Sequence, residues 1–119
     1  MPVVQLNLLV LKTDQMARQA AFYAALGFTF EQHRHGNGPV HYASIGGAPV
    51  LEIYPLPKNV TTPDSTSRLG FLVDDLPALI STLQEMQVTI VSQPAQTEWG
   101  FAAVVQDFDG RKVELTQAE

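Results

Sequence analysis

The sequence predicts an α+β fold made of two β-α-β-β-β repeats, and two observations support this prediction. First, an apolar strand pattern followed by an amphipathic segment occurs twice, with Asp14 and Asp74 at equivalent positions. Second, each half ends with a strand, a glycine-containing turn and a closing strand, and Glu52 in the first half corresponds to Glu114 in the second. The 119 residues therefore form one domain of two repeats.

The first repeat covers residues 3–55. Residues 7–12 are apolar and predict a strand, and the spacing of apolar residues within 14–26 predicts a helix. The apolar residues near helical spacing are Met16, Ala20, Tyr23 and Leu26. A short strand at 27–30 follows the helix, and a hairpin with a Gly-Gly turn completes the repeat within 40–55.

The second repeat covers residues 68–117 and has the same order of elements. It follows a linker at 56–67, which contains prolines and little hydrophobicity. After its first strand, a helix is expected over 74–86 and a strand over 87–91. A loop and a closing hairpin with an Asp-Gly turn at 102–117 complete the repeat.

Composition and charge exclude several partners. The formal net charge is −5 and the basic residues are scattered, so no nucleic-acid partner is expected. The chain contains no cysteine, which rules out disulfides and thiolate ligands. The N-terminal apolar run lacks a preceding basic segment, and no segment approaches the roughly 20 apolar residues of a membrane span. A cytoplasmic protein without a membrane partner is expected.

Two motifs indicate a family. AFYAALGF at 21–28 lies in the first predicted helix, and DFDGRKVELTQ at 107–117 forms the closing hairpin. Together with the two repeats, these motifs resemble the vicinal oxygen chelate superfamily, which contains glyoxalase I, bleomycin-resistance proteins and extradiol dioxygenases. The resemblance implies two curled mixed sheets around a cleft, with the helices on the outer faces. It also implies that the family's enzymes hold a divalent metal with ligands from the first and last strand of each repeat.

The resemblance places the last-strand ligand positions on Glu52 and Glu114, as catalytic residues and as ligands of any metal. The first-strand positions fall on Asn7, or on Gln5 if the alignment shifts by two, and on Arg68. Arginine has no lone pair to donate, and an asparagine carbonyl is a weak ligand. We therefore expect no cofactor and no tightly bound metal, with a divalent metal held by the two glutamates as the alternative.

Two glutamates that face one cleft repel each other unless a cation lies between them. We expect Arg68 to take that place, because a guanidinium pairs with carboxylates in bidentate geometry. The alternative is that Arg68 extends to solvent from the strand edge. Side-chain alternation adds Tyr54 to the face of Glu52, and it adds Gln5 to the face of Asn7, as residues that bind a ligand.

Three histidines and the tryptophan each allow more than one interpretation. His41, in the strand VHYASI, is a third ligand, a general base or a hydrogen-bonded strand residue. His33 and His35 have the H-x-H spacing of a strand-borne metal site, or they belong to a solvated loop. Trp99 precedes a strand at a glycine, where it covers the ligand cleft or caps the core.

These residues predict a glyoxalase/bleomycin-resistance-like protein that binds a small organic molecule without a tightly bound metal. The first alternative is a metal-dependent lyase, isomerase or dioxygenase that uses Glu52 and Glu114. The second is a dimeric scaffold with an incidental cleft. Whether the protein is an enzyme stays open, because fold alone does not define function.

A homodimer is also expected. The strand that begins VVQLNLLVLK carries apolar residues on both faces, which is more than a half-exposed strand needs. The residues on one face are Val4, Leu6, Leu8 and Val10, and those on the other are Leu9 and Leu11. We therefore expect the first strand of each repeat to lie near a two-fold interface.

Overall fold

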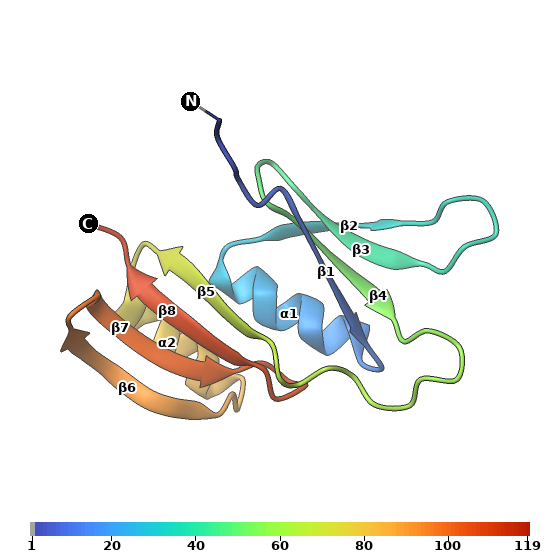
Figure 1. Ribbon diagram of the computed structural model, residues 1–119. Helices are drawn as coiled ribbons and strands as arrows, with labels where there is room; N and C mark the ends of the chain where they lie inside the picture. Colours follow the sequence, from blue (N-terminus) through green and yellow to red (C-terminus); the bar gives the residue numbers. More distant parts are fainter. Residues whose placement is uncertain (1) are drawn as a thin grey trace.

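The chain forms the same five elements twice in succession (Figure 1). The computed structural model describes residues 2–119. The elements of the first repeat are β1 (Leu8–Thr13), α1 (Met16–Leu26), β2 (Thr29–His33), β3 (His41–Ile45) and β4 (Val50–Pro55). Those of the second repeat are β5 (Arg68–Val73), α2 (Leu76–Glu85), β6 (Ile90–Thr97), β7 (Gly100–Gln106) and β8 (Lys112–Gln117).

Each repeat builds its own four-stranded mixed sheet. The strand order is β1-β4-β3-β2 in the first sheet and β5-β8-β7-β6 in the second. In both sheets the first strand of the repeat pairs parallel with the last, and the other pairs are antiparallel. The predicted α+β fold of two repeats is therefore confirmed. Within residues 2–119, neither helix has the length and apolar character needed to cross a membrane.

Both helices begin two residues later than predicted. The expected starts are Asp14 and Asp74, whereas the first helical residues are Met16 and Leu76. In α2 the N-cap is Asp75, whose carboxylate accepts a hydrogen bond from the backbone N–H of Ala78 at 3.1 Å. The acidic residues therefore lie just before the helices. Asp75 accepts a hydrogen bond from the first turn of α2, and Asp14 and Asp74 lie next to the helix starts.

Strand β6 differs most from the prediction. A strand over 87–91 followed by a loop is expected, but β6 extends to Thr97 and its pairing with β7 contains two register shifts. Pro94 lies within this strand and has no N–H to donate. Because β6 is an edge strand, the missing hydrogen bond is tolerated there.

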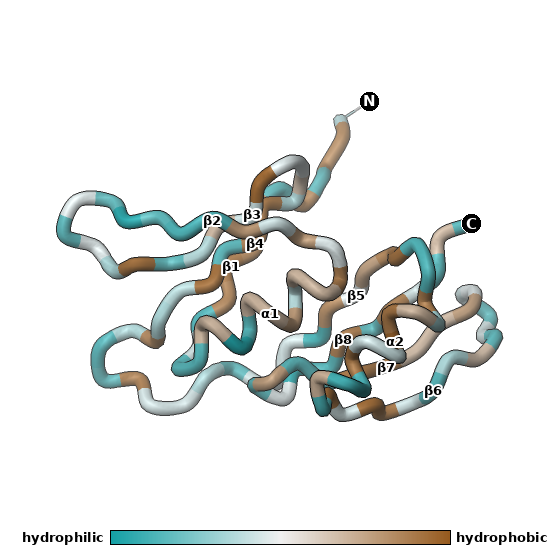
Figure 2. Tube along the Cα trace, turned by 180° about the vertical axis from the view of Figure 1, so that it is seen from behind, coloured by the Kyte–Doolittle hydropathy of each residue, from teal (hydrophilic) through white to brown (hydrophobic). Residues whose placement is uncertain are grey.

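The core lies between each sheet and its helix, and α1 also joins the two repeats. Phe22 and Tyr23 of α1 are both 0% exposed. The ring of Tyr23 packs edge-on against Phe71 of β5, with the ring centroids 6.2 Å apart. Hydrophobic residues concentrate in the helices and strands, whereas the loop between β2 and β3 is hydrophilic (Figure 2).

A buried polar cluster around Arg111 connects the two repeats. The guanidinium is 1% exposed and donates to Oδ2 of Asp107 and to Oδ2 of Asp109, each at 3.1 Å. It also donates to the backbone carbonyl of Lys12 in β1 at 3.2 Å, and its Nε lies 3.5 Å from Oδ2 of Asp64. One side chain thus contacts the first repeat, the linker and the second repeat.

Helix α1 and its N-cap residue Gln15 supply further donors to this cluster. The hydroxyl of Tyr23 donates to Asp107 at 2.6 Å, and the amides of Gln15 and Gln19 donate to Asp109 at 2.8 and 2.7 Å. Burial, followed by the nearby Asp107 carboxylate, raises the pKa of Tyr23, so its hydroxyl stays protonated. Burial opposes ionisation of Asp109, but its hydrogen bonds, led by that from Gln15, lower its pKa overall.

Replacing Arg111 with Met should lower the free energy of unfolding by about 3–5 kcal/mol, because the buried carboxylates lose their cation. The variant Lys112→Met removes the same charge from the exposed neighbouring position and should cost less than about 1 kcal/mol. Urea unfolding followed by circular dichroism measures both losses. Equal losses in the two variants would contradict the structural role of Arg111.

Candidate functional site

The face of each sheet that points away from its helix is uncovered. On the first sheet this open face exposes Val10 by 38%, and on the second it exposes Leu72 by 75%. Val10 pairs with Glu52 across β1 and β4, and Gly70 pairs with Glu114 across β5 and β8. Because directly paired residues share a face, the two glutamates lie on the open faces of different sheets.

The predicted alternation, which placed Asn7 and Gln5 on the face of Glu52, is not the alternation that β1 shows over Leu8–Thr13. Glu52 pairs with Val10, so the even-numbered residues of β1 share its face. Leu9, which shares the parity of Asn7, packs against the core instead. The side-chain alternation of β1 is therefore shifted by one residue from the predicted alternation. The strand was recognised from an apolar run, and a run without alternating polarity does not show which residues face the core.

The equivalent of Arg68 in the first repeat is Leu8, since each is the first residue of the first strand. Neither residue at the start of the first strands therefore supplies a metal ligand, and Asn7, the predicted position, offers only an amide carbonyl. Leucine has no lone pair, arginine has only N–H donors, and Glu114 is already held by Arg68. Glu52 is then the one carboxylate that remains to bind an ion, so a divalent metal does not fit these positions.

Arg68 pairs with one glutamate rather than with two. Its Nη2 donates to Oε2 of Glu114 at 3.2 Å, and the part of the chain described, residues 2–119, contains no ion pair between Arg68 and Glu52. The side chains of Arg68 and Glu114 are 54% and 37% exposed. The expected bridge is therefore present on one side only, and solvent screens it.

Trp99 stands beside this ion pair on the second sheet. It lies in the turn between β6 and β7 and is 76% exposed, so it does not cap the core. With Leu72 and Thr116 it lines a hollow of about 550 Å³, and with Glu114 it lines a smaller one of about 90 Å³. An aromatic surface, an apolar surface and a charged pair therefore meet on the second open face.

His41 is the buried polar residue of the first open face. It is 1% exposed, and its ring stacks on that of Tyr54 with the centroids 4.0 Å apart. Its Nδ1 donates to the carbonyl of Pro39 at 3.3 Å. Its Nε2 lies 4.0 Å from Oε2 of Glu52 and has no hydrogen-bond partner among the described residues 2–119. One ring nitrogen is therefore satisfied and the other is not.

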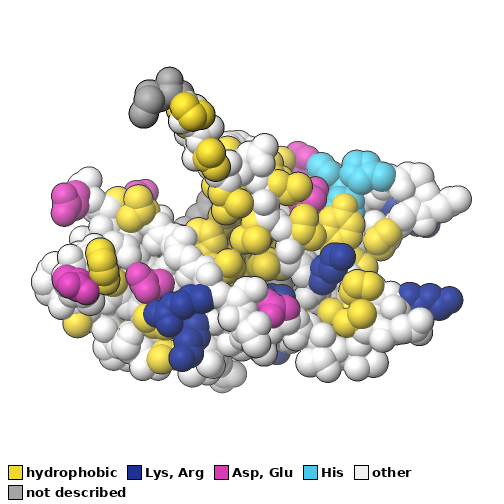
Figure 3. Space-filling model, viewed as in Figure 1, with side chains coloured by type: hydrophobic (Ala, Val, Ile, Leu, Met, Phe, Trp, Pro, Cys, Tyr) yellow, Lys and Arg dark blue, Asp and Glu magenta, His cyan; other side chains and the backbone are white. Residues whose placement is uncertain are grey.

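His33 and His35 lie next to His41. The register of β2 and β3 pairs His33 directly with His41, and one ligand nitrogen from each of the three rings lies within 4.8 Å of the others. Histidine side chains gather in one patch of the surface, beside acidic and apolar side chains (Figure 3), while His41 itself is buried. The H-x-H spacing suggested only two members, because the third comes from the neighbouring strand.

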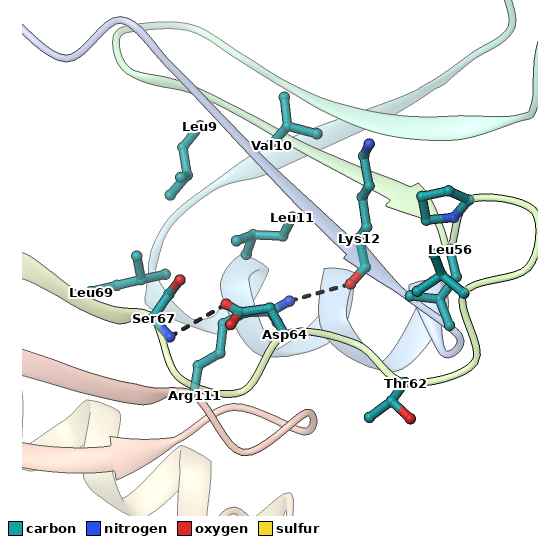
Figure 4. A pocket seen from close by; sticks show the side chains of 12 residues that line it. Leu9, Val10, Leu11, Lys12, Leu56, Thr62, Asp64, Ser67, Leu69 and Arg111 are labelled. Carbon is teal, nitrogen blue, oxygen red and sulfur yellow. Dashed lines mark hydrogen bonds and ion pairs between the residues drawn. The ribbon is translucent and has the colours of Figure 1, made fainter.

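A third hollow, of about 330 Å³, lies between β1 and the linker (Figure 4). Its walls are mainly apolar, with Leu9, Leu69 and Val60 among them. Its polar groups Arg111 and Asp64 already face each other at 3.5 Å. Hydrogen bonds from Ser67 and Thr66 lower the pKa of Asp64 and fix its carboxylate. Because these two charged groups are already paired, the open faces are better candidates for a ligand site.

Residues 5–115 match the model of the Glyoxalase/Bleomycin resistance protein/Dioxygenase superfamily. No curated protein matches the chain. Among solved structures, a glyoxalase family protein from Bacillus cereus has a TM-score of 0.77 and 13% identity, over 98% of this chain and 95% of that one. An antibiotic binding protein from a Streptomyces species has a TM-score of 0.72 and 23% identity, over 100% of this chain and 99% of that one. A virulence protein from Salmonella typhimurium has a TM-score of 0.72 and 20% identity over both full chains.

Replacing Arg68 with Ala should lower the free energy of unfolding by less than about 1 kcal/mol, because its ion pair is exposed. The variant Glu114→Gln removes the same pair from the other side and should cost about as little. Thermal or urea unfolding of both variants checks this. A loss of about 3 kcal/mol or more for Arg68→Ala alone would indicate a second, buried carboxylate partner.

Proposed function

Because the chain belongs to the Glyoxalase/Bleomycin resistance protein/Dioxygenase superfamily, we propose that it binds a small organic molecule on the open face of its second sheet. The hollow of about 550 Å³ beside Trp99 carries this proposal. Its volume falls within the roughly 300–1,000 Å³ typical of small-molecule sites. The antibiotic binding protein of the same fold supports this class of ligand.

The walls of the hollow favour a flat molecule with both apolar and polar groups, because Gln96, Gln117 and Glu119 line it together with Trp99 and Leu72. Trp99 and Leu72 are 76% and 75% exposed, and a ligand that covers them removes apolar surface from water. The Trp99 ring offers a face for stacking. The smaller hollow that Trp99 also lines contains Glu114, whose carboxylate is paired with Arg68 and provides an acceptor for a polar group of the ligand.

Binding without a metal at the family's ligand positions follows from the donor set. A metal-dependent lyase, isomerase or dioxygenase would need Glu52 and Glu114 around one ion with further ligands from the first strands, where Leu8 and Arg68 offer none. The guanidinium of Arg68 already compensates the charge of Glu114. We therefore favour a binding protein over a metal-dependent enzyme.

We also propose that two chains form a homodimer whose contact covers the open faces. The segment before β1 exposes Val3, Val4 and Leu6 by 76%, 95% and 63%, and it continues into Leu8, which is 49% exposed. Both β1 and β5 are edge strands with free backbone groups. A second copy placed against these surfaces would bury apolar area and enclose the ligand between two chains.

Trp99 is the single tryptophan, so its fluorescence reports directly on the proposed ligand site. Titration with bleomycin and a panel of flat aromatic antibiotics should give saturable quenching with at least one compound. Calorimetry should then show affinity reduced by about tenfold or more in Leu72→Asp, because the apolar wall is lost. The matched control Val60→Asp, at an exposed valine of the linker, should bind as tightly as the wild type. Equal weakening in both variants, or no saturable quenching at all, would contradict the site.

Light scattering of the full chain should give twice the chain mass of 13.0 kDa at tens of micromolar protein. Leu8→Asp should shift the particle towards one chain, because it introduces a charge into the proposed contact. Val60→Asp adds the same charge in the linker and should leave the mass unchanged. A wild-type particle of 13.0 kDa would refute the dimer.

A further inference from the structure

We propose that His33, His35 and His41 form a binding site for a borderline divalent transition metal, such as Zn²⁺, at the loop end of the β2–β3 hairpin. One ligand nitrogen from each ring lies within 4.8 Å of the other two. Imidazole is a preferred ligand of Zn²⁺, Ni²⁺ and Cu²⁺. The site is separate from the positions that the family resemblance assigns to a metal, because none of the three histidines occupies a first or last strand.

The hairpin builds this cluster from two strands and a turn. His33 is the last residue of β2 and His41 is the first residue of β3, and the two are directly paired. His35 lies two residues beyond β2, and its carbonyl accepts a hydrogen bond from the N–H of Gly38 at 2.9 Å. This turn returns the chain and holds His35 over His41, with ring centroids 5.2 Å apart.

Two of the three rings already make a hydrogen bond to a carboxylate or a backbone carbonyl, as metal-binding histidines do with their second ring nitrogen. His33 shares a hydrogen bond of 3.1 Å between its Nε2 and the carboxylate of Glu31. His41 donates from Nδ1 to the carbonyl of Pro39 at 3.3 Å. In metal sites such a bond fixes the ring and leaves the opposite nitrogen to bind the ion. The opposite nitrogen of His41, Nε2, is buried without a hydrogen-bond partner among residues 2–119.

The present spacing is close to that of a bound site but slightly wider. Tetrahedral coordination with metal–nitrogen distances of about 2.0–2.1 Å places ligand nitrogens roughly 3.4 Å apart. Reaching it requires the nitrogens, now within 4.8 Å, to approach one another by rotation of a side chain. His35 is exposed and free to rotate, whereas His41 is fixed by its stack on Tyr54. The buried ring therefore anchors the site and the exposed ring closes it.

Nearby carboxylates make the histidine cluster favourable for a cation. Glu31 contacts His33, and Glu52 has its Oε2 at 4.0 Å from Nε2 of His41. Three imidazoles occupy three positions of a tetrahedral ion and leave the fourth for water or for an oxygen of a small molecule. An open fourth position is typical of zinc sites that bind a substrate or ligand rather than of purely structural sites.

The test is calorimetric titration of the untagged full chain with Zn²⁺. We expect one ion per chain with micromolar or tighter affinity, and a loss of about tenfold or more in His35→Ala and in His33→Gln. Asn37→Ala changes an exposed residue of the same loop and is the matched control, with unchanged affinity expected. His35 is exposed, so its removal leaves the core intact, and circular dichroism verifies the fold of each variant.

Several outcomes would overturn the proposal. These are no Zn²⁺ binding by the wild type, equal affinity in wild type and His35→Ala, or loss of binding in Glu114→Gln with binding kept in His35→Ala. The last result would assign the ion to the family's positions instead. Because the organic ligand is detected through Trp99 on the other sheet, quenching should persist in His35→Ala. Failure of the metal site and failure of the proposed ligand site are therefore distinguishable.

Discussion

The arrangement of the two repeats depends on the buried guanidinium of Arg111. A charge removed from water is tolerated only when several partners surround it, and here they come from three parts of the chain. Asp107 and Asp109 belong to the second repeat, the carbonyl of Lys12 belongs to β1, and Asp64 belongs to the linker. Because all must meet at one point, α1 is held against the second repeat, and the apolar contacts between the repeats form around this cluster. The sheet faces that carry no helix are left open.

The internal symmetry of the chain sets the backbone of both halves but not their chemistry. Leu8 and Arg68 hold equivalent positions, and so do Val10 and Gly70, next to the paired glutamates. One open face thus presents three imidazoles and a carboxylate, and the other presents an indole ring and an ion pair. A divalent metal suits the first set of donors, and an organic molecule suits the second. The two proposed sites can therefore coexist on one chain and differ in the ligand that each selects.

Several features of the fold could be predicted because they depend on local pattern. Alternating and helical periodicities located the strands and helices, and the repeated order placed Glu52 and Glu114 on the last strand of each repeat. The alternation of β1 was predicted wrongly, since a strand with apolar residues on both faces gives no sign of which face is inside. Strand β6 was predicted too short, because Pro94 suggests a loop unless the strand is known to lie at an edge.

The sequence by itself determined the two repeats and their order of elements. It also determined that Arg68 cannot bind a metal, because all three features depend on residue type and spacing. The tertiary structure alone decided which distant groups meet. The burial of Arg111 was not predicted, since arginine is usually exposed and its partners lie up to 99 residues away. The meeting of His41 with His33 depends on strand register, and the limitation of Arg68 to one glutamate depends on the separation of the sheets. Such contacts follow from how the elements pack in space, which no local pattern of residues encodes.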